Sequence, residues 1–348
     1  MTISGTPGDD QVEEGGSKVK AMVYTSYGTP ERLALREVEK PIPAPGEVLI
    51  RVYAASLNSW DWDLLRGKPW LTRLEGLRTP KYGILGADIA GRVEATGSGV
   101  HAFRPGDEVF GDLSGCGFGG LSEYVRARAD VLSLKPPGMS FEEAAAVPQA
   151  GVLALQGLRD KGSIKRGQNV MINGGGGGVG TFAVQLAKTY GADVTVVDAA
   201  GKLDKLVSIG ADRVVDYAAE DISRMGRTYD LILDVVGNRS ALDFNRILRP
   251  QGSYVMVGGT VHRLFQLLLF GPLLSTATRK KSGFLIHRPN PQDLRLLGEL
   301  YANGKLAPVI DRCYPLREAA EAFEYFGSGR HVGKIVIRME HLLPCPLR

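Results

Sequence analysis

The sequence predicts an α/β protein in which a doubly wound parallel sheet follows a β-rich segment, and three observations lead to this fold class. A short apolar strand over residues 170–173 runs directly into a glycine turn and then a helix. Strand and helix patterns alternate from there to about residue 260, which is typical of a parallel sheet. Residues 20–134 instead contain short strands separated by frequent Gly and Pro, which favours a compact β structure.

The glycine turn has the pattern of a dinucleotide site, G-x-G-x-x-G between a strand and a helix. The residues of this motif are Gly175, Gly177, Gly178, Val179 and Gly180. Glycines at these positions allow a tight turn, close approach of the backbone to a pyrophosphate, and close packing of the helix on the strand. We expect the helix over residues 181–190, and its free N–H groups and dipole would favour an anion.

The second strand of the α/β segment ends at Asp198, about 20 residues after the motif begins. A carboxylate at this place accepts hydrogen bonds from the adenosine ribose and repels a 2′-phosphate, so the sequence predicts NAD(P)H binding with a preference for NADH. Lys202 and Lys205 lie just beyond and would reduce that repulsion. The alternative is that Asp198 only caps the following turn.

Further strands are expected over 213–215, 231–234 and 254–257, with helices over 202–209 and 240–248. Gly237 and the pair Gly258–Gly259 follow the ends of two of these strands. Ligands bind at the carboxyl edge of open α/β sheets, so these glycines are expected to line the cofactor cleft.

Composition excludes several classes of protein. The net charge is +4 and the basic residues are dispersed, which argues against a nucleic-acid partner. The three cysteines, Cys116, Cys313 and Cys345, form no Cys-x-x-Cys pair, which disfavours a disulfide framework and a structural zinc site. A reducing compartment fits this usage, and we expect a cytoplasmic protein. Residues 1–17 are rich in Gly and acidic residues and are interpreted as a disordered leader, not a signal peptide.

The most apolar stretch covers residues 264–274 and is too short to span a bilayer. Three interpretations remain open for it: a buried core helix or subunit contact, a wall over an apolar substrate pocket, or a membrane attachment. We expect a homodimer without a membrane span.

Short motifs along the chain resemble the medium-chain dehydrogenase/reductase superfamily, in particular its zinc-free quinone-oxidoreductase-like and enoyl-reductase-like branch. They lie at residues 45–50, 86–91, 105–109, 210–212 and 333–336, together with the glycine turn. The resemblance covers about residues 18–338. It implies a Rossmann domain over 151–295 inserted in a GroES-like, β-rich catalytic domain. That catalytic domain is expected to comprise residues 18–150 and 296–340, with strands near 309–310 and 334–337, and to be followed by a tail at 341–348.

The resemblance also bears on metal content. Zinc-dependent relatives carry Cys where this chain has Asn58, and His-Glu where it has Ala87-Asp88. A catalytic zinc needs about three protein ligands, so we expect no metal. Without a Lewis acid, the expected reaction is NAD(P)H-dependent hydride transfer to an apolar conjugated acceptor, such as a quinone, enone or enoyl thioester, whose enolate needs only hydrogen bonds. The alternatives are a zinc-free carbonyl or alcohol dehydrogenase and a non-enzymatic NAD(P)H-binding scaffold.

Asn58 is the first candidate for the catalytic hydrogen bond, because its amide donates without titrating. Asp61 is expected to order a water or to orient Asn58. The alternative for both is that they cap a helix over 62–66. Tyr53 and Tyr82 are weaker candidates for a proton donor, because aromatic residues in strands are usually core.

Other polar positions are expected to have lesser roles. Relatives commonly carry a Thr near the nicotinamide ribose, where this chain has Leu153, which cannot donate a hydrogen bond. Gln149 is the candidate to compensate, and Leu153 is the best support for the scaffold alternative. His287 and His331 fall in expected loops and are interpreted as surface residues.

Overall fold

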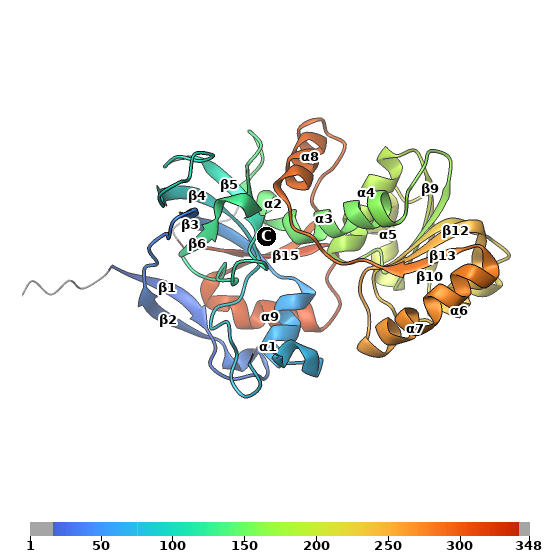
Figure 1. Ribbon diagram of the computed structural model, residues 1–348, viewed down its shortest axis with the longest axis horizontal. Coiled ribbons are helices and arrows are strands. Elements are labelled where there is room, and N and C mark those ends of the chain that lie inside the picture. The colour runs from blue at the N-terminus through green and yellow to red at the C-terminus, as the bar shows by residue number, and fades with distance from the viewer. Residues whose placement is uncertain (1–16, 75, 341–348) are drawn as a thin grey trace, which may run out of the picture.

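The computed structural model describes residues 17–74 and 76–340, and within residues 270–278 it describes the backbone only. The expected leader, apart from Ser17, and the expected tail lie outside the described residues. Two lobes are visible in Figure 1, one built from the blue-to-green N-terminal strands and one from the yellow and orange segments. Two helices of the middle of the chain, α2 and α3, lie between the lobes (Figure 1).

The second lobe is built on a six-stranded parallel sheet in the order β10-β9-β8-β11-β12-β13. Its strands are β8 Asn169–Asn173, β9 Asp193–Asp198, β10 Arg213–Asp216, β11 Tyr229–Asp234, β12 Leu248–Met256 and β13 Lys281–Phe284. Its helices are α4 Gly178–Thr189, α5 Leu203–Ser208, α6 Ala241–Ile247 and α7 Val261–Thr278. The predicted doubly wound parallel sheet is thereby confirmed. Strand order reverses between β8 and β11, and ligands bind at such a switch point.

The helix expected over 181–190 begins earlier, at Gly178. Gly177 is its N-cap and has an extended backbone, with φ −83° and ψ 178°. Glycine is a poor helix former, so the sequence pattern placed Gly178 and Gly180 in the turn. Tertiary packing overrides that preference, because the first turn of α4 lies directly against the end of β8.

The first lobe contains a seven-stranded sheet in the order β14-β15-β3-β4-β5-β7, with β6 also paired to β3, and a separate β1-β2 pair. Its strands are β1 Lys18–Val23, β2 Ala34–Glu39, β3 Glu47–Ser56, β4 Asp88–Thr96, β5 Glu108–Asp112, β6 Tyr124–Arg128, β7 Leu132–Leu134, β14 Ile310–Pro315 and β15 Lys334–Arg338. Helices of the remaining segments are α1 Ser59–Arg66, α2 Phe141–Ala146, α3 Pro148–Gln156, α8 Pro291–Ala302 and α9 Ala319–Gly327. After the parallel sheet the chain therefore returns to β3, and the exact domain boundaries stay predictions.

Strand β3 is buried along most of its length. Val48, Ile50 and Val52 are fully buried, and Leu49 between them is also buried. One hydrophobic cluster continues from the parallel sheet through α2 and α3 to Ala90 and Phe110 of the first lobe. Helices α2 and α3 thus attach the two sheets to each other and fix the place where their edges meet.

Helix α7 contains the apolar stretch at 264–274 and differs from a fully buried helix. Leu267 is buried, but Phe265, Leu268 and Leu269 are 54%, 47% and 71% exposed. The side chains from 270 onward lie outside the described residues. The core-helix interpretation is therefore wrong for these three positions in the single chain, while the subunit contact, substrate wall and membrane attachment stay predictions. Among the described residues, no helix is both long and apolar enough to cross a membrane.

Candidate active site

The glycine turn after β8 forms an open cradle at the start of α4. A Cβ at Gly180 would lie 2.4 Å from the carbonyl oxygen of Gly174, so the helix start packs directly on the turn. A Cβ at Gly177, in contrast, would meet no atom within 4 Å. The free N–H groups at the start of α4 face this open side, where a pyrophosphate is favoured by hydrogen bonds and by the helix dipole. The residues present therefore fit a dinucleotide.

Asp198 lies at the end of β9 and is tied to the glycine turn. Its Oδ2 accepts a hydrogen bond from the Gly176 N–H at 2.6 Å, and its Oδ1 accepts one from the Ala199 N–H at 2.8 Å. The Lys202 Nζ is 4.0 Å from Oδ1. Asp198 thus supports the turn and also caps the next one. A carboxylate oxygen can accept more than one hydrogen bond, so these two bonds do not exhaust the acceptor capacity of Asp198.

The adjoining loops of the parallel sheet are braced by a buried carboxylate. Asp234 accepts hydrogen bonds from the Asn173 side chain at 2.8 Å and from the Gly237 N–H at 2.9 Å. Burial raises the pKa of Asp234, and these bonds oppose the rise. A Cβ at Gly237, where φ is 61°, would lie 2.5 Å from the Gly258 carbonyl oxygen. The loops carrying Gly237, Gly258 and Gly259 therefore pack together at the edge where the glycine turn lies.

Asn58 is the N-cap residue of α1 and lies in a buried polar cluster between the lobes, with 6% exposure. Its Nδ2 donates to Asp88 Oδ2 at 3.0 Å, and its Oδ1 accepts from the Lys334 ammonium. Asp61 does not share in these side-chain bonds: its two oxygens accept from the backbone N–H groups of Asn58 at 3.0 Å and Gly86 at 2.9 Å. Complete burial raises the pKa of Asp61 to about 7, while those two donors oppose the rise.

Lys334 is the member of this cluster that sequence reasoning missed. Its side chain is 3% exposed, and besides Asn58 its Nζ donates to the Leu57 carbonyl at 3.0 Å and to Asp88 Oδ2 at 3.3 Å. The preceding residue, Gly333, donates its N–H to the Gly176 carbonyl at 2.8 Å. Strand β15 thus brings the cluster against the glycine turn. The available signal was a lysine within an otherwise apolar strand pattern.

Helix α3 contributes Gln149, the candidate to compensate for Leu153. The Gln149 N–H donates to Asp88 Oδ1 at 3.0 Å, and Gln149 is 4% exposed. Its Nε2 is buried and has no hydrogen-bond partner among the described residues. An unpartnered buried amide costs free energy unless a ligand completes it. The Gln149 Nε2 group is therefore suited to donate a hydrogen bond to an oxygen of a cofactor or substrate. The Leu153 side chain has no hydrogen-bond donor.

The surface assignment of His287 and His331 is wrong. The His287 side chain is 12% exposed, and its Nε2 lies 2.6 Å from Asp112 Oδ2, across the two lobes. His331 is 9% exposed and stacks on Phe326 with ring centroids 4.9 Å apart. Burial, followed by the charge of Lys202, lowers the pKa of His331 to about 4. Both segments are loops as expected, but Asp112 of the first lobe faces His287, and Phe326 of α9 stacks on His331.

An aromatic cavity of about 270 Å³ lies beside α1, the helix that Asn58 begins. Trp60 meets Phe118 edge-on with centroids 5.9 Å apart, and Tyr82 lies 4.9 Å from the same ring. The other lining residues include Tyr24, Tyr27, Leu64 and Leu71. Flat apolar walls of this kind suit a planar conjugated molecule. Tyr53 instead stacks on Phe141 of α2 at 4.3 Å.

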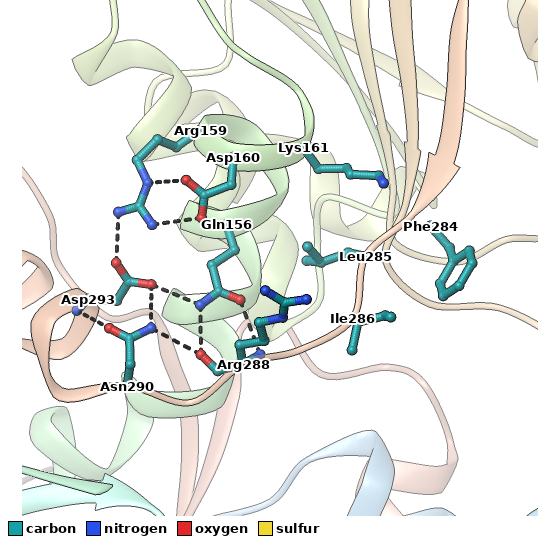
Figure 2. Close-up of a pocket in the computed structure, with 10 residues that line it drawn as sticks. All are labelled: Gln156, Arg159, Asp160, Lys161, Phe284, Leu285, Ile286, Arg288, Asn290 and Asp293. Atoms are coloured by element: carbon teal, nitrogen blue, oxygen red, sulfur yellow. Dashed lines mark hydrogen bonds and ion pairs between the residues drawn. The ribbon is translucent and has the colours of Figure 1, made fainter. Parts of the chain in front are cut away.

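A larger cavity of about 450 Å³ lies where α3, β13 and α8 meet (Figure 2). Arg159 pairs with Asp293 at 2.7 Å, and Gln156 donates to the same carboxylate at 2.8 Å and to the Arg288 carbonyl at 2.8 Å. Figure 2 shows these side chains directed at one another. We interpret this cavity as a structural joint, because the side chains of Gln156, Arg159, Asn290 and Asp293 bond to one another across it.

Among residues 17–74 and 76–340, no group of three or more His, Cys, Asp and Glu side chains is arranged to hold a metal ion. A dinucleotide cradle on the second lobe that faces a buried amide, ammonium and carboxylate of the first lobe is the architecture of a two-lobed, nicotinamide-dependent oxidoreductase.

Comparisons with known proteins give the family. The model of the alcohol dehydrogenase GroES-like domain matches residues 44–137, and that of zinc-binding dehydrogenases matches residues 209–337. The 2-methylene-furan-3-one reductase of Solanum lycopersicum is 33% identical over 92% of this chain and 79% of its own length. The chloroplast envelope quinone oxidoreductase homolog of Arabidopsis thaliana is 31% identical over 92% of this chain and 99% of its own.

A solved structure, the quinone oxidoreductase from Coxiella burnetii, is 30% identical with a TM-score of 0.82, covering 92% of this chain and 99% of that one. The chain therefore belongs to the medium-chain dehydrogenase/reductase superfamily and is an oxidoreductase. The predicted resemblance and fold class are confirmed.

Proposed function

We propose that the chain catalyses zinc-independent, NAD(P)H-dependent reduction of a small conjugated acceptor: a quinone, an enone or an enoyl thioester. The observation that carries this proposal is the buried cluster of Asn58, Asp88 and Lys334. The family resemblance places Asn58 and Asp88 where zinc-dependent relatives carry Cys and Glu, and both side chains are bonded to the Lys334 ammonium. The relatives named as quinone oxidoreductases and reductases support the same class of acceptor.

The glycine turn, Asp198 and Gln149 are the residues proposed to hold the cofactor, which supplies the hydride when bound. We propose a preference for NADH. We propose that the carboxylate of Asp198 binds the adenosine ribose and repels a 2′-phosphate, and that the Lys202 ammonium, 4.0 Å from it, reduces this repulsion without removing it. A cytoplasmic location and a homodimer likewise remain proposals.

Asn58 is proposed to donate a hydrogen bond to the acceptor's oxygen. Hydride addition to the β carbon of a conjugated acceptor places negative charge on that oxygen, and a fixed donor stabilises the charge as it forms. The amide has two N–H groups, and only one is used by Asp88. A neutral donor is weaker than a Lewis acid, which favours a conjugated acceptor over a simple ketone. The aromatic cavity beside α1 is the proposed binding place of its apolar part.

The scaffold alternative rests on Leu153, which cannot donate near the nicotinamide. The buried, unpartnered Nε2 of Gln149 weakens that alternative, because it offers a donor on the same helix. This donor agrees with the relatives, which are named as oxidoreductases and reductases.

The Asn58→Ala variant tests this role. A neutral hydrogen bond used in the transition state is worth about 1 to 3 kcal/mol, so turnover with an active conjugated acceptor should fall roughly 10- to 100-fold. The NADH dissociation constant, measured by fluorescence titration, should remain nearly unchanged. Asn303→Ala, at an exposed helix end, is the matched control and should retain full turnover. Unchanged turnover in Asn58→Ala would make Asn58 a structural residue.

A further inference from the structure

Lys334 is the buried cation of the Asn58–Asp88–Lys334 cluster, with a side chain that is 3% exposed. The pairing of β15 with β3 explains why Lys334 lies in the site. Val336 of β15 is opposite Ser56 of β3, and the Leu57 N–H donates to the Ile335 carbonyl at 3.0 Å, so Lys334 falls beside Asn58. Its stem runs over α4: a Cβ at Gly178 would lie 2.7 Å from Lys334 Cδ. The lysine is thus held between the cofactor turn and Asn58.

The hydrogen bonds of the ammonium are fully used within the protein. An ammonium has three N–H donors, and Lys334 Nζ meets three acceptors: the Leu57 carbonyl, Asn58 Oδ1 and Asp88 Oδ2. No donor remains for a cofactor phosphate or an acceptor oxygen. Any effect of Lys334 on the reaction must therefore pass through the residues that it contacts.

Asn58 is the contact through which such an effect would pass. An asparagine amide can rotate by half a turn and exchange its oxygen with its NH₂ group, and the two orientations differ only in their hydrogen bonds. Here the ammonium demands the oxygen on one side, and the Asp88 carboxylate demands the NH₂ group on the other. In the reversed orientation, NH₂ would face an ammonium and the oxygen would face a carboxylate.

We propose that Lys334 is a positioning residue for the reaction: its ammonium holds Asn58 with the second amide N–H available as the donor to the acceptor oxygen. This inference rests on the proposed function. The side chain acts by fixing the amide orientation and by polarising the amide through its oxygen. It makes no contact with the reacting atoms.

A double-mutant cycle with Asn58→Ala and Lys334→Met tests the proposal. Steady-state turnover, the KM for an active enone or quinone, and the NADH dissociation constant are measured for both single variants and for the double variant. Lys334→Met should lower turnover 10- to 100-fold, while the NADH dissociation constant changes less than about threefold. The double variant should be no more than about threefold slower than the slower single variant, because both substitutions remove the same donor.

Removing one partner of a buried ion pair can unfold a protein, because Asp88 would keep a charge without a partner. The variant Asp88→Asn/Lys334→Met removes both charges, retains an acceptor for the Asn58 amide, and should show the same loss of turnover. Lys135→Met is the matched control, because Lys135 is another buried lysine, with 6% side-chain exposure and an ion pair to Glu108. It should retain wild-type turnover.

Three results would overturn the proposal. The first is full turnover in a folded Lys334→Met protein. The second is a double variant whose loss is the product of the two single losses, since Lys334 would then act independently of Asn58. The third is a rise of the NADH dissociation constant that accounts for the lost turnover, which would make Lys334 a cofactor-binding residue. If instead Asn58→Ala retains full turnover, the assigned role of Asn58 fails first, and this inference fails with it.

Discussion

Replacing Gly180 with alanine should weaken NADH binding by at least about 100-fold, or about 2.7 kcal/mol. The added Cβ would lie 2.4 Å from the Gly174 carbonyl oxygen and 2.5 Å from two backbone atoms of Gly175. Real Cβ atoms do not approach this closely, and the obstacle is backbone, so the turn must move away from α4. Its N–H groups would then no longer converge on the pyrophosphate. Overpacking of this kind should also lower the free energy of unfolding by about 1 to 3 kcal/mol.

Two further alanine variants separate the effect on binding from the effect on stability. Gly177→Ala adds a Cβ that meets no atom within 4 Å, so stability should be retained while the methyl group blocks the cofactor. Gly115→Ala also meets no atom and lies on another loop, so it should change neither property. Fluorescence titration with NADH and thermal denaturation measure the two effects. Wild-type affinity in Gly180→Ala would show that the dinucleotide does not bind over this turn.

The His287→Leu variant should lower the free energy of unfolding by about 3 to 5 kcal/mol near neutral pH. Asp112 is 2% exposed and loses the partner whose Nε2 lies 2.6 Å away, so a buried carboxylate oxygen is left without that hydrogen bond. Burial by itself would raise the pKa of Asp112, but the hydrogen bond and charge of His287 hold it below its ordinary value.

Because the pKa of Asp112 is lowered in the folded state, the free energy of unfolding depends on pH in a definite direction. A depressed folded-state pKa stabilises the fold above the unfolded pKa of Asp, about 3.9, and this stabilisation is lost as pH falls through the folded-state value. The variant lacks this contribution, so its deficit should persist from neutral pH down to about pH 4 and should shrink only as the pH falls further, through the folded-state pKa of Asp112. Urea denaturation at several pH values measures it. His287→Gln, which can still donate to Asp112, should recover part of the loss, and the exposed His101→Leu should have no effect. A deficit that does not change with pH would contradict this account of the pair.

The sequence predicted the parallel sheet, its strand ends and the glycine turn, because these features depend on local periodicity and on residues with special backbone preferences. It also identified Asn58 as a polar residue directly after a strand. The alternative was that Asn58 and Asp61 only cap a helix. This alternative describes Asp61 better than it describes Asn58, because both oxygens of Asp61 accept hydrogen bonds from backbone N–H groups. The side chain of Asn58 is instead directed at Asp88 and Lys334.

The residues that sequence reasoning missed come from distant segments. Lys334 reaches Asn58 only because β15 pairs with β3 after the whole parallel sheet has been completed. His287 is largely covered, and its imidazole meets Asp112 of the other lobe. Such contacts depend on how the lobes meet, and no local pattern of hydrophobic and polar residues encodes that. A lysine within an apolar strand is the one local signal that pointed to the missing part of the site.

Hydride transfer to a conjugated acceptor without a metal is tested directly by one measurement. Initial rates of NADH and NADPH oxidation are recorded with protein shown by elemental analysis to contain well under one zinc per chain. The acceptors are a quinone, an enone, an enoyl thioester and the saturated ketone that matches the enone. We predict turnover with at least one conjugated acceptor, none with the saturated ketone, and a lower KM for NADH than for NADPH. Activity that requires stoichiometric zinc, or equal reduction of the saturated ketone, would contradict the account.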